Sequence, residues 1–159
     1  MYRIRAAIWE DLPEVLRVYE YARDFMAKTG NPNQWGKINP PQTVLEEDIR
    51  EGNLYVVEDS SGIHGVFAFL PGEDPTYGYI EGAWRYDEAY AAIHRVASDG
   101  SGGIFGKILA FARSRSAYLR IDTHDDNRVM QHVLEKHGFV RCGRIYLADG
   151  DPRIAYDRK

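Results

Sequence analysis

Two histidines stand where their ring nitrogens could move a proton. His94 lies within residues 90–98, which read as a strand, and His124 follows the short apolar run 118–122. An imidazole titrates near neutral pH and is therefore suited to general acid–base chemistry. Each histidine also has a structural explanation: His94 can be a hydrogen-bonded strand residue, and His124 can belong to a helix-capping turn.

The turn that contains His124 reads DTHDDN over residues 122–127. The structural explanation takes Asp125 or Asp126 as the N-cap of the helix that follows, and the residue types favour it. Asp122 and Glu81 are carboxylate candidates for the same proton transfer. The sequence therefore leaves the base open among two histidines and two acids.

A glycine-rich loop is the second chemical feature. Residues 98–109 read SDGSGGIFGKIL and run directly into a predicted helix. A helix N-terminus presents unpaired N–H groups and the positive end of the helix dipole, so a glycine-rich entry is a ready phosphate site. A P-loop is excluded, because Ile108 stands where that motif needs Ser or Thr. A dinucleotide-binding loop remains an alternative, since Asp122 ends the next strand about 20 residues on, although Phe105 replaces its third glycine.

The hydrophobic pattern of the sequence predicts the strands and helices that would position these side chains. Apolar residues that alternate or run together predict strands, and apolar residues at helical spacing predict helices. The expected strands cover 2–8, 54–58, 63–70, 90–98, 118–122, 139–146 and 153–156, with a less regular one in 71–84. The expected helices cover 11–28, 42–51, 104–115 and about 127–137. This order, with one strand–helix–strand crossover, predicts a mixed α/β or α+β fold and a single domain over residues 1–159.

Composition narrows the class of protein. The chain has 159 residues, 44% of them hydrophobic and 13% aromatic, which is enough for one packed core. The formal net charge is −4 and no basic block is present, so nucleic acid is a disfavoured partner. The single Cys142 fits a reducing compartment and no segment suits a membrane span, so we expect a cytoplasmic protein without a membrane partner. His132 and His137 have no carboxylate or cysteine at ligand spacing, so we expect no metal.

The order of elements and one long segment resemble the GNAT superfamily of acyl-CoA-dependent N-acyltransferases. The segment is 119–147, LRIDTHDDNRVMQHVLEKHGFVRCGRIYL, and the opening 4–23, IRAAIWEDLPEVLRVYEYAR, is similar to that family's usual first strand and helix. Asn127 and the Gly138-Phe139 pair match positions typical of the family. The resemblance covers essentially the whole chain and implies a mostly antiparallel central sheet of six to seven strands with about four helices.

The resemblance implies acetyl-CoA as the cosubstrate. In the family, a loop of pattern Gln/Arg-x-x-Gly-x-Gly/Ala holds the CoA pyrophosphate on backbone amides. That loop begins here at Gly100 when counted back from the helix, or at Ser101 when counted forward from Val96, and it lacks the Gln or Arg. The residues implied for acetyl-CoA are Val96, Ala97, Ser98, Ser101, Gly102, Gly103, Ile104, Phe105, Gly106, Lys107 and Asn127.

The implied reaction is direct attack of an amine on the thioester, without a covalent enzyme intermediate. An alkyl amine is mostly protonated at neutral pH, so a base must remove a proton directly or through water. A backbone N–H near Val96 or Ala97 is the implied partner of the carbonyl. The family often places a proton-donating tyrosine at the position that Leu134 holds here. Tyr146 or water is the alternative donor to the leaving thiolate.

The acceptor side is less defined. Trp35, Tyr79 and Trp84 precede the predicted acyl-binding strand and, with Glu81, are candidates to line a pocket for a small-molecule or peptide amine. The same aromatic residues can also be core or lid packing. The main alternative function is a catalytically weak acyl-CoA-binding regulatory module, which Leu134 favours. A homodimer is a further expectation that the sequence leaves open.

Overall fold

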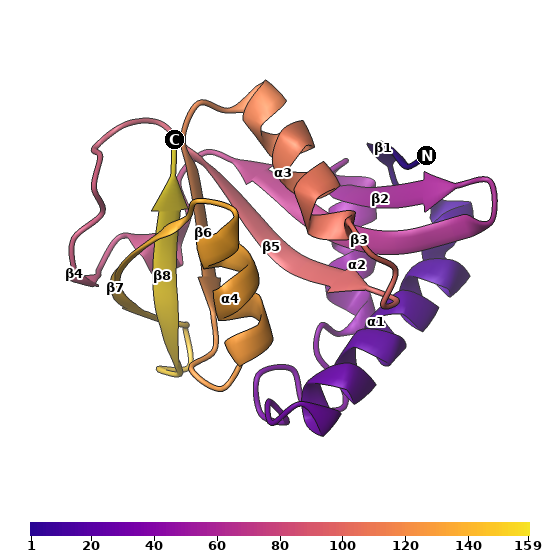
Figure 1. Ribbon diagram of the computed structural model, residues 1–159, viewed down its shortest axis with the longest axis horizontal. Coiled ribbons are helices and arrows are strands. Elements are labelled where there is room, and N and C mark those ends of the chain that lie inside the picture. The colour runs from indigo at the N-terminus through magenta and orange to yellow at the C-terminus, as the bar shows by residue number, and fades with distance from the viewer.

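The computed structural model describes residues 1–159 and contains one eight-stranded sheet with helices on both faces (Figure 1). In chain order the elements are β1 (Arg3–Ala6), α1 (Leu12–Lys28), α2 (Gln42–Arg50), β2 (Leu54–Asp59), β3 (Gly62–Pro71), β4 (Glu81–Gly82), β5 (Ala91–Ser98), α3 (Ile104–Arg115), β6 (Leu119–Thr123), α4 (Arg128–Lys136), β7 (Val140–Tyr146) and β8 (Pro152–Arg158). Short 3-10 turns cover Trp9–Asp11 and Pro75–Tyr77.

The strand order is β1-β2-β3-β5-β6-β8-β7-β4, and only the β5–β6 pair is parallel. The expected mixed, mostly antiparallel sheet is therefore confirmed. The strand count is eight because the irregular segment 71–84 contributes the two-residue strand β4, which pairs with β7. A dinucleotide-binding fold is excluded, since that fold needs successive parallel strands.

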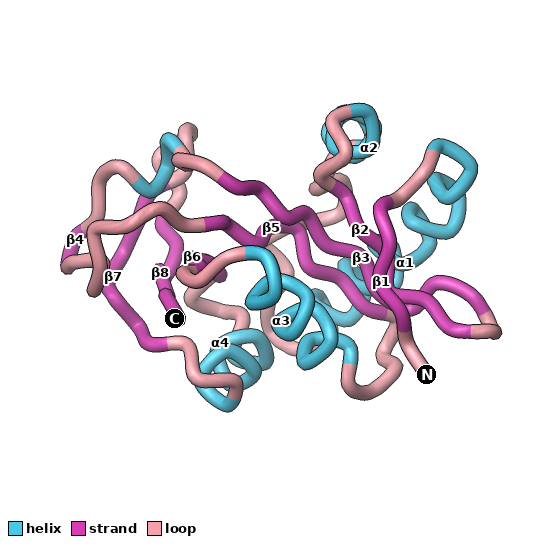
Figure 2. The backbone as a smooth tube through the Cα atoms, turned by 90° about the horizontal axis from the view of Figure 1, so that it is seen from above, coloured by secondary structure: helices cyan, strands magenta, loops and turns pink.

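The helices cover opposite faces of the sheet. Figure 2 shows α3 and α4 on one face and α1 and α2 on the other. Between α1, α2 and the sheet lies one apolar cluster, to which α1 contributes a buried stripe of Val15, Val18, Tyr19 and Ala22 at helical spacing. A larger cluster under α3 and α4 includes Phe67, Ile93, Ile121 and Leu134. The core therefore holds the middle of the sheet rigidly from both sides.

The two central strands, β5 and β6, separate soon after they meet. They pair only at Ala91↔Leu119 and Ala92↔Arg120, and beyond these residues they diverge in a V (Figure 1). Hydrogen bonding between β5 and β6 stops there, so an open space separates the residues that follow on these two strands. The sheet itself thereby forms the walls of a cavity.

A bulge in β5 helps to set this divergence. Val66 pairs with Ala97 and Ala68 with His94, so one residue of β3 opposes two of β5. Arg95 sits in the bulge with φ of 53°, a left-handed conformation that is unfavourable for a residue with a side chain.

Two helices hold this bulged residue in place. The Arg95 guanidinium donates to both carboxylate oxygens of Asp48 on α2, at 2.8 and 3.0 Å. The Tyr19 hydroxyl of α1 donates to the Arg95 carbonyl at 2.6 Å. The strained backbone is thus fixed by charged and polar contacts from the helix layer.

Candidate active site

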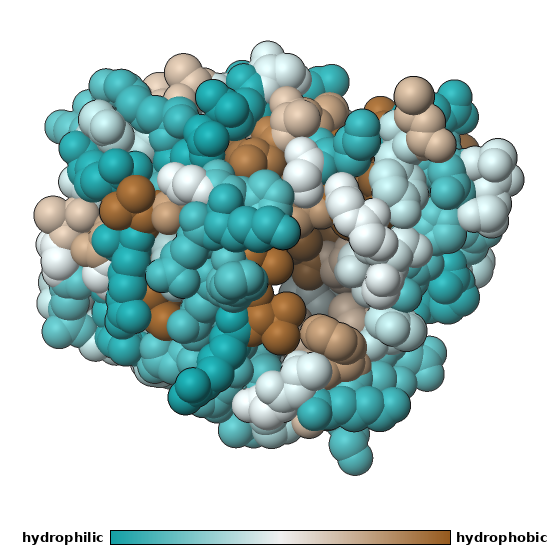
Figure 3. Space-filling view, in the orientation of Figure 1, coloured by the Kyte–Doolittle hydropathy of each residue, from teal (hydrophilic) through white to brown (hydrophobic).

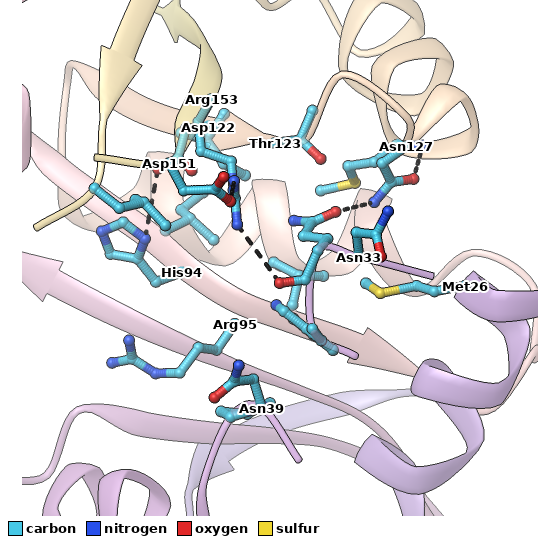
Figure 4. Close-up of a pocket in the computed structure, with 18 of the residues that line it drawn as sticks. Met26, Asn33, Asn39, His94, Arg95, Asp122, Thr123, Asn127, Asp151 and Arg153 are labelled. Atoms are coloured by element: carbon cyan, nitrogen blue, oxygen red, sulfur yellow. Dashed lines mark hydrogen bonds and ion pairs between the residues drawn. The ribbon is translucent and has the colours of Figure 1, made fainter. Parts of the chain in front are cut away.

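A polar cavity of about 490 Å³ lies where β5 and β6 diverge; we call it the splay cavity (Figure 4). Its walls come from β5, β6, the α1–α2 connection, the start of α4 and the β7–β8 turn. The residues that line it are Met26, Asn33, Gln34, Trp35, Asn39, Pro40, Pro41, Val44, Ile93, His94, Arg95, Val96, Ile121, Asp122, Thr123, Asn127, Met130, Leu147, Asp149, Asp151 and Arg153. Segments far apart in sequence therefore converge on one space.

A second, mostly apolar cavity of about 240 Å³ runs between α1 and α4; we call it the α1–α4 groove. The residues that line it are Tyr21, Ala22, Phe25, Met26, Thr29, Val96, Ala97, Ser98, Gly100, Ile104, Phe105, Asn127, Val129, Met130 and Val133. Figure 3 shows this face of the molecule hollowed, with hydrophobic side chains around the hollow.

The two cavities share a border. Met26, Val96, Asn127 and Met130 line both of them. An elongated ligand with an apolar arm can therefore lie in the α1–α4 groove and present its end to the polar splay cavity.

The glycine loop leads to one end of the groove. Helix α3 begins at Ile104, as the sequence predicts, and its N-cap Gly103 has φ of 79° and provides no side-chain cap. The first N–H groups of α3 therefore have no capping side chain, which is the arrangement that binds anions. Gly100, with φ of 89°, lies so close to Tyr21 that an added Cβ would be 2.7 Å from the tyrosine hydroxyl oxygen. A side chain at position 100 would disturb the groove wall.

The predicted cofactor residues divide into two groups. Those that line the α1–α4 groove are Val96, Ala97, Ser98, Ile104, Phe105 and Asn127. Those that lie in the loop or the first turn of α3 without lining it are Ser101, Gly102, Gly103, Gly106 and Lys107. The first group is mostly apolar, and the second lies at the uncapped N-terminus of α3.

His94 projects into the splay cavity from β5 and forms a tight pair with Asp74. Its Nε2 lies 2.6 Å from Asp74 Oδ2. Its Nδ1 lies 3.8 Å from Asp122 Oδ2 on the facing strand (Figure 4). Burial opposes ionisation of Asp74, but hydrogen bonds from His94 and Thr76 outweigh it and lower the pKa of the carboxyl to about 2. When His94 is neutral, donation of Nε2–H to this carboxylate leaves the lone pair on Nδ1. The ring is therefore oriented to accept a proton on the side of Asp122.

Asp122 is held by a buried tyrosine. The Tyr77 hydroxyl donates to Asp122 Oδ2 at 2.6 Å. Burial and the neighbouring Asp122 charge raise the pKa of Tyr77 well above its ordinary value, so this hydroxyl stays protonated. Asp74 and Tyr77 both come from the irregular segment before β5. Sequence reasoning did not connect them to His94 and Asp122, because no local pattern reveals a contact across 20 or 45 residues.

The remaining charges of the splay cavity are mostly paired. Arg95 is bound to Asp48, and the buried Arg153 guanidinium donates to Asp151 at 2.6 Å. Asp122 faces the cavity with only the His94 ring as a basic neighbour, and Asp149 faces it without an ion-pair partner. The cavity therefore favours a cationic ligand over an anionic one.

Polar groups from the α1–α2 connection and α4 close the cavity on the groove side. Asn127 is the N-cap of α4: its Oδ1 accepts from Met130 N at 3.0 Å, and its Nδ2 donates to Gln34 Oε1 at 2.9 Å. The prediction that Asp125 or Asp126 caps this helix is wrong, because the chain turns one residue later. Thr123 Oγ1 is buried and has no hydrogen-bond partner in the protein.

Several predicted site residues lie outside the splay cavity. His124 does not line it, and its Nδ1 accepts from the Asp126 backbone N–H at 3.0 Å, as a turn residue would. Tyr146 is partly exposed on β7, where its hydroxyl donates to Glu81. Tyr79 is exposed, with its ring 6.5 Å from that of Tyr146. Tyr79, Glu81 and Tyr146 therefore form a surface group at β4 and β7, separate from His124 in the turn before α4.

The two predicted tryptophans are also separated. Trp35 lines the splay cavity and packs on Tyr19, with ring centroids 5.6 Å apart. Trp84 lines a different cavity, where the Arg120 guanidinium lies 4.2 Å from its ring centroid. Of the four residues predicted for the acceptor, the structure brings only Trp35 to the splay cavity.

Two further positions bear on the chemistry. Leu134 is fully buried in the core under α3 and α4, so it has neither a donor nor access to the cavities. Burial raises the pKa of the Cys142 thiol to about 11, which makes it a poor nucleophile at neutral pH.

No group of three or more His, Cys, Asp or Glu side chains is arranged to hold a metal ion. None of the helices has the length and apolar character needed to traverse a bilayer.

Comparison with known proteins shows which solved structures share this architecture. No family model matches the sequence, and no curated protein matches it. An acetyltransferase of the GNAT family from Streptococcus agalactiae superposes with a TM-score of 0.89 and 30% identity, over 99% of this chain and 94% of that one. A GNAT-family acetyltransferase from Listeria monocytogenes has a TM-score of 0.72 and 16% identity, over 99% and 94% of the two chains.

A third solved structure shares the fold at low identity. The ribosomal-protein-alanine N-acetyltransferase from Brucella melitensis has a TM-score of 0.63 and 20% identity, over 98% of each chain. At such identity the likeness shows the fold alone, whereas the streptococcal protein matches in sequence as well over nearly the whole length. The diverging central strands, the uncapped helix after the glycine loop and this match agree: the chain belongs to the GNAT family of acetyltransferases.

Proposed function

We propose that the protein transfers the acetyl group of acetyl-CoA to a primary amine, either a small molecule or a peptide amine, by direct attack. The observation that carries this proposal is the junction of the two cavities. The apolar α1–α4 groove meets the polar splay cavity at Val96 and Asn127, and His94 faces that polar space. A thioester arm and an amine approaching from opposite sides would meet at this junction.

The chain offers sites that suit the pyrophosphate, the pantetheine arm and the thioester of acetyl-CoA. The uncapped N-terminus of α3 suits the pyrophosphate, because its N–H groups point outward at the positive end of the helix dipole. The groove between α1 and α4 suits the pantetheine arm, and a backbone N–H near Val96 would polarise the thioester carbonyl. Lys107, in the first turn of α3, adds a positive charge near the phosphates.

On the acceptor side, Asp122 and Asp149 attract the ammonium form of the amine. His94 then takes one proton at Nδ1, directly or through a water beside Asp122, and Asp74 stabilises the imidazolium. The amine nitrogen forms a bond to the carbonyl carbon as the carbon–sulfur bond breaks. The leaving thiolate, with a pKa of about 8.5, takes up through water the second proton, which the nitrogen loses as it becomes an amide. The buried Thr123 hydroxyl is free to donate a hydrogen bond at this junction.

The test is thiol release from acetyl-CoA in the presence of a panel of amines. We expect His94→Ala to slow turnover about 100-fold or more while the Kd for acetyl-CoA stays the same, since loss of a general base has this effect. The exposed His132→Ala variant on α4 is the matched control and keeps full activity. If His94→Ala retains wild-type turnover and the same pH optimum, His94 is structural and the proposed base is refuted.

A regulatory module without efficient chemistry is the second candidate, because the buried Leu134 removes a hydroxyl donor from α4. Acetyl-CoA that binds tightly but gives no amine-stimulated thiol release with any amine of the panel would favour this candidate.

A further inference from the structure

His64 lies at the centre of a polar cluster outside both cavities. Its Nδ1 lies 2.7 Å from Asp99 Oδ2, and its Nε2 lies 2.9 Å from Asp59 Oδ1. Two hydroxyls complete the surroundings: Ser61 Oγ at 2.7 Å from Nε2 and Ser101 Oγ at 3.3 Å from Nδ1. Each of the two ring nitrogens therefore has one carboxylate and one hydroxyl within hydrogen-bonding distance.

These four partners belong to two separate parts of the fold. Asp59 and Ser61 lie at the tip of the β2–β3 hairpin, whereas Asp99 and Ser101 lie in the glycine loop between β5 and α3. The backbone joins the same segments, because Asp99 N donates to the His64 carbonyl at 3.0 Å. Within the loop, Ser101 N donates to Asp99 Oδ1 at 3.1 Å. The ring is thus the side-chain link that fixes the first half of the loop to the rigid sheet.

The charges around the ring favour its protonated form. The hydrogen bond to Asp99 raises the pKa of His64 most, Asp59 raises it further, and partial burial opposes both. The only other ring nearby is that of Tyr2, whose centroid lies 6.0 Å away in an edge contact. Glu14 of α1 contacts the neighbouring Ile63 N–H rather than His64. Loss of the proton would leave Asp59 and Asp99 as two uncompensated carboxylates beside the loop.

We propose that His64 positions the glycine loop for the pyrophosphate of acetyl-CoA, and that its protonation makes cofactor affinity dependent on pH. The inference rests on the proposed function, because it takes the loop to be the pyrophosphate site. As imidazolium, His64 binds both carboxylates and neutralises the Asp99 charge that would otherwise repel a pyrophosphate. As neutral imidazole, it can donate to only one of them, so the loop is held less firmly and the local charge is more negative.

The direction of the pH effect depends on whether the free or the cofactor-bound protein holds the His64 proton more tightly. Pyrophosphate adds negative charge next to the ring, so the complex retains the His64 proton to a higher pH than the free protein does. Affinity is therefore greatest at low pH and falls as the pH rises through the titration of the free protein's ring. It becomes constant again once the ring is neutral in both the free and the bound protein.

The experiment measures the Kd of dephospho-CoA by titration calorimetry from about pH 5.5 to about pH 8.5, a range that spans imidazole titration. This probe keeps the pyrophosphate and lacks the 3′-phosphate, whose own second ionisation near pH 6 would confuse the result. For the wild type we expect Kd to rise about fivefold across the range, the effect of one modest interaction. His64→Gln, which can still donate a hydrogen bond but does not titrate, should give a weak and nearly constant affinity.

Two other variants sharpen the test. Asp59→Asn removes one of the two charges that face the ring while the loop stays unchanged, so the pH at which affinity falls should move lower. His132→Gln on α4 should behave as the wild type does. Thermal unfolding at each pH shows which variants are folded, and if His64→Gln is not, the Asp59→Asn midpoint decides the question.

The results separate the possible failures. If His64→Gln binds with the wild-type affinity and pH dependence, or the Asp59→Asn midpoint does not move, the inference about His64 is wrong although the proposed function stands. If the wild type binds neither CoA nor dephospho-CoA at any pH, the proposed function fails and this inference fails with it.

Discussion

The pair between His94 and Asp74 gives the sharpest prediction about catalysis. Asp74→Asn keeps the size of the side chain and its ability to accept a hydrogen bond, but it removes the negative charge 2.6 Å from His94 Nε2. A neutral imidazole loses little by this change. The imidazolium that forms as the amine is deprotonated loses a charge-assisted hydrogen bond, so the effect should fall on turnover.

The magnitude follows from the geometry. A hydrogen bond to a charged group is worth about 1.5–3 kcal/mol, and both side chains here are about four-fifths buried, at 20% and 18% exposed, so most of it should be retained. With 1.36 kcal/mol per factor of ten, a loss of about 2 kcal/mol lowers kcat about 30-fold. The α1–α4 groove does not include Asp74, so the Kd for acetyl-CoA should remain that of the wild type.

The assay is steady-state thiol release with a saturating amine, together with calorimetric binding of acetyl-CoA. Glu73→Gln, a neutral substitution of the adjacent exposed carboxylate, is the matched control and should leave kcat unchanged. Equal kcat in Asp74→Asn and the wild type would refute the role of this pair, and a raised Kd for acetyl-CoA would show that Asp74 acts on the cofactor side instead.

Two further predictions concern stability and the groove. Tyr118 donates to the fully buried Asp157 at 2.7 Å, so Tyr118→Phe should lower the free energy of unfolding by about 2 kcal/mol in urea titrations at neutral pH. That loss should shrink as the pH falls through the lowered pKa of Asp157, and a loss independent of pH would contradict the assignment. Gly100→Ala strains a left-handed residue and pushes on Tyr21, so the Kd for acetyl-CoA should rise about fivefold. Gly30→Ala has similar φ but no close contact, and an equal effect there would refute the role of Tyr21.

Much of the scaffold could be predicted because local signals agree with the final packing. Helix α3 spans 104–115 as predicted, since glycines precede it and apolar residues follow at helical spacing. The helix after Asn127 ends before Gly138, which adopts φ of 86° as a helix stop requires. A strand within 71–84 could be predicted, but the bounds of β4 could not be, because two residues form a strand only where β7 offers its edge.

Part of the candidate site could also be predicted from local signals in the sequence. His94 could be identified from its residue type and its strand, but its partner Asp74 comes from an irregular segment whose path no periodicity encodes. The bulge at Arg95 arises from the pairing of β3 with β5, which a single segment does not reveal. His64 carries no motif at all, and its importance follows only from the meeting of a hairpin and a loop 35 residues apart.

In the proposed reaction this chain acetylates an amine at the junction of the two cavities. The most direct test is thiol release from acetyl-CoA by the wild-type protein with a broad panel of small-molecule and peptide amines. We expect thiol release that depends on the amine, saturates with it and is lost in His94→Ala. Tight binding of acetyl-CoA without amine-dependent release from any member of the panel would contradict it.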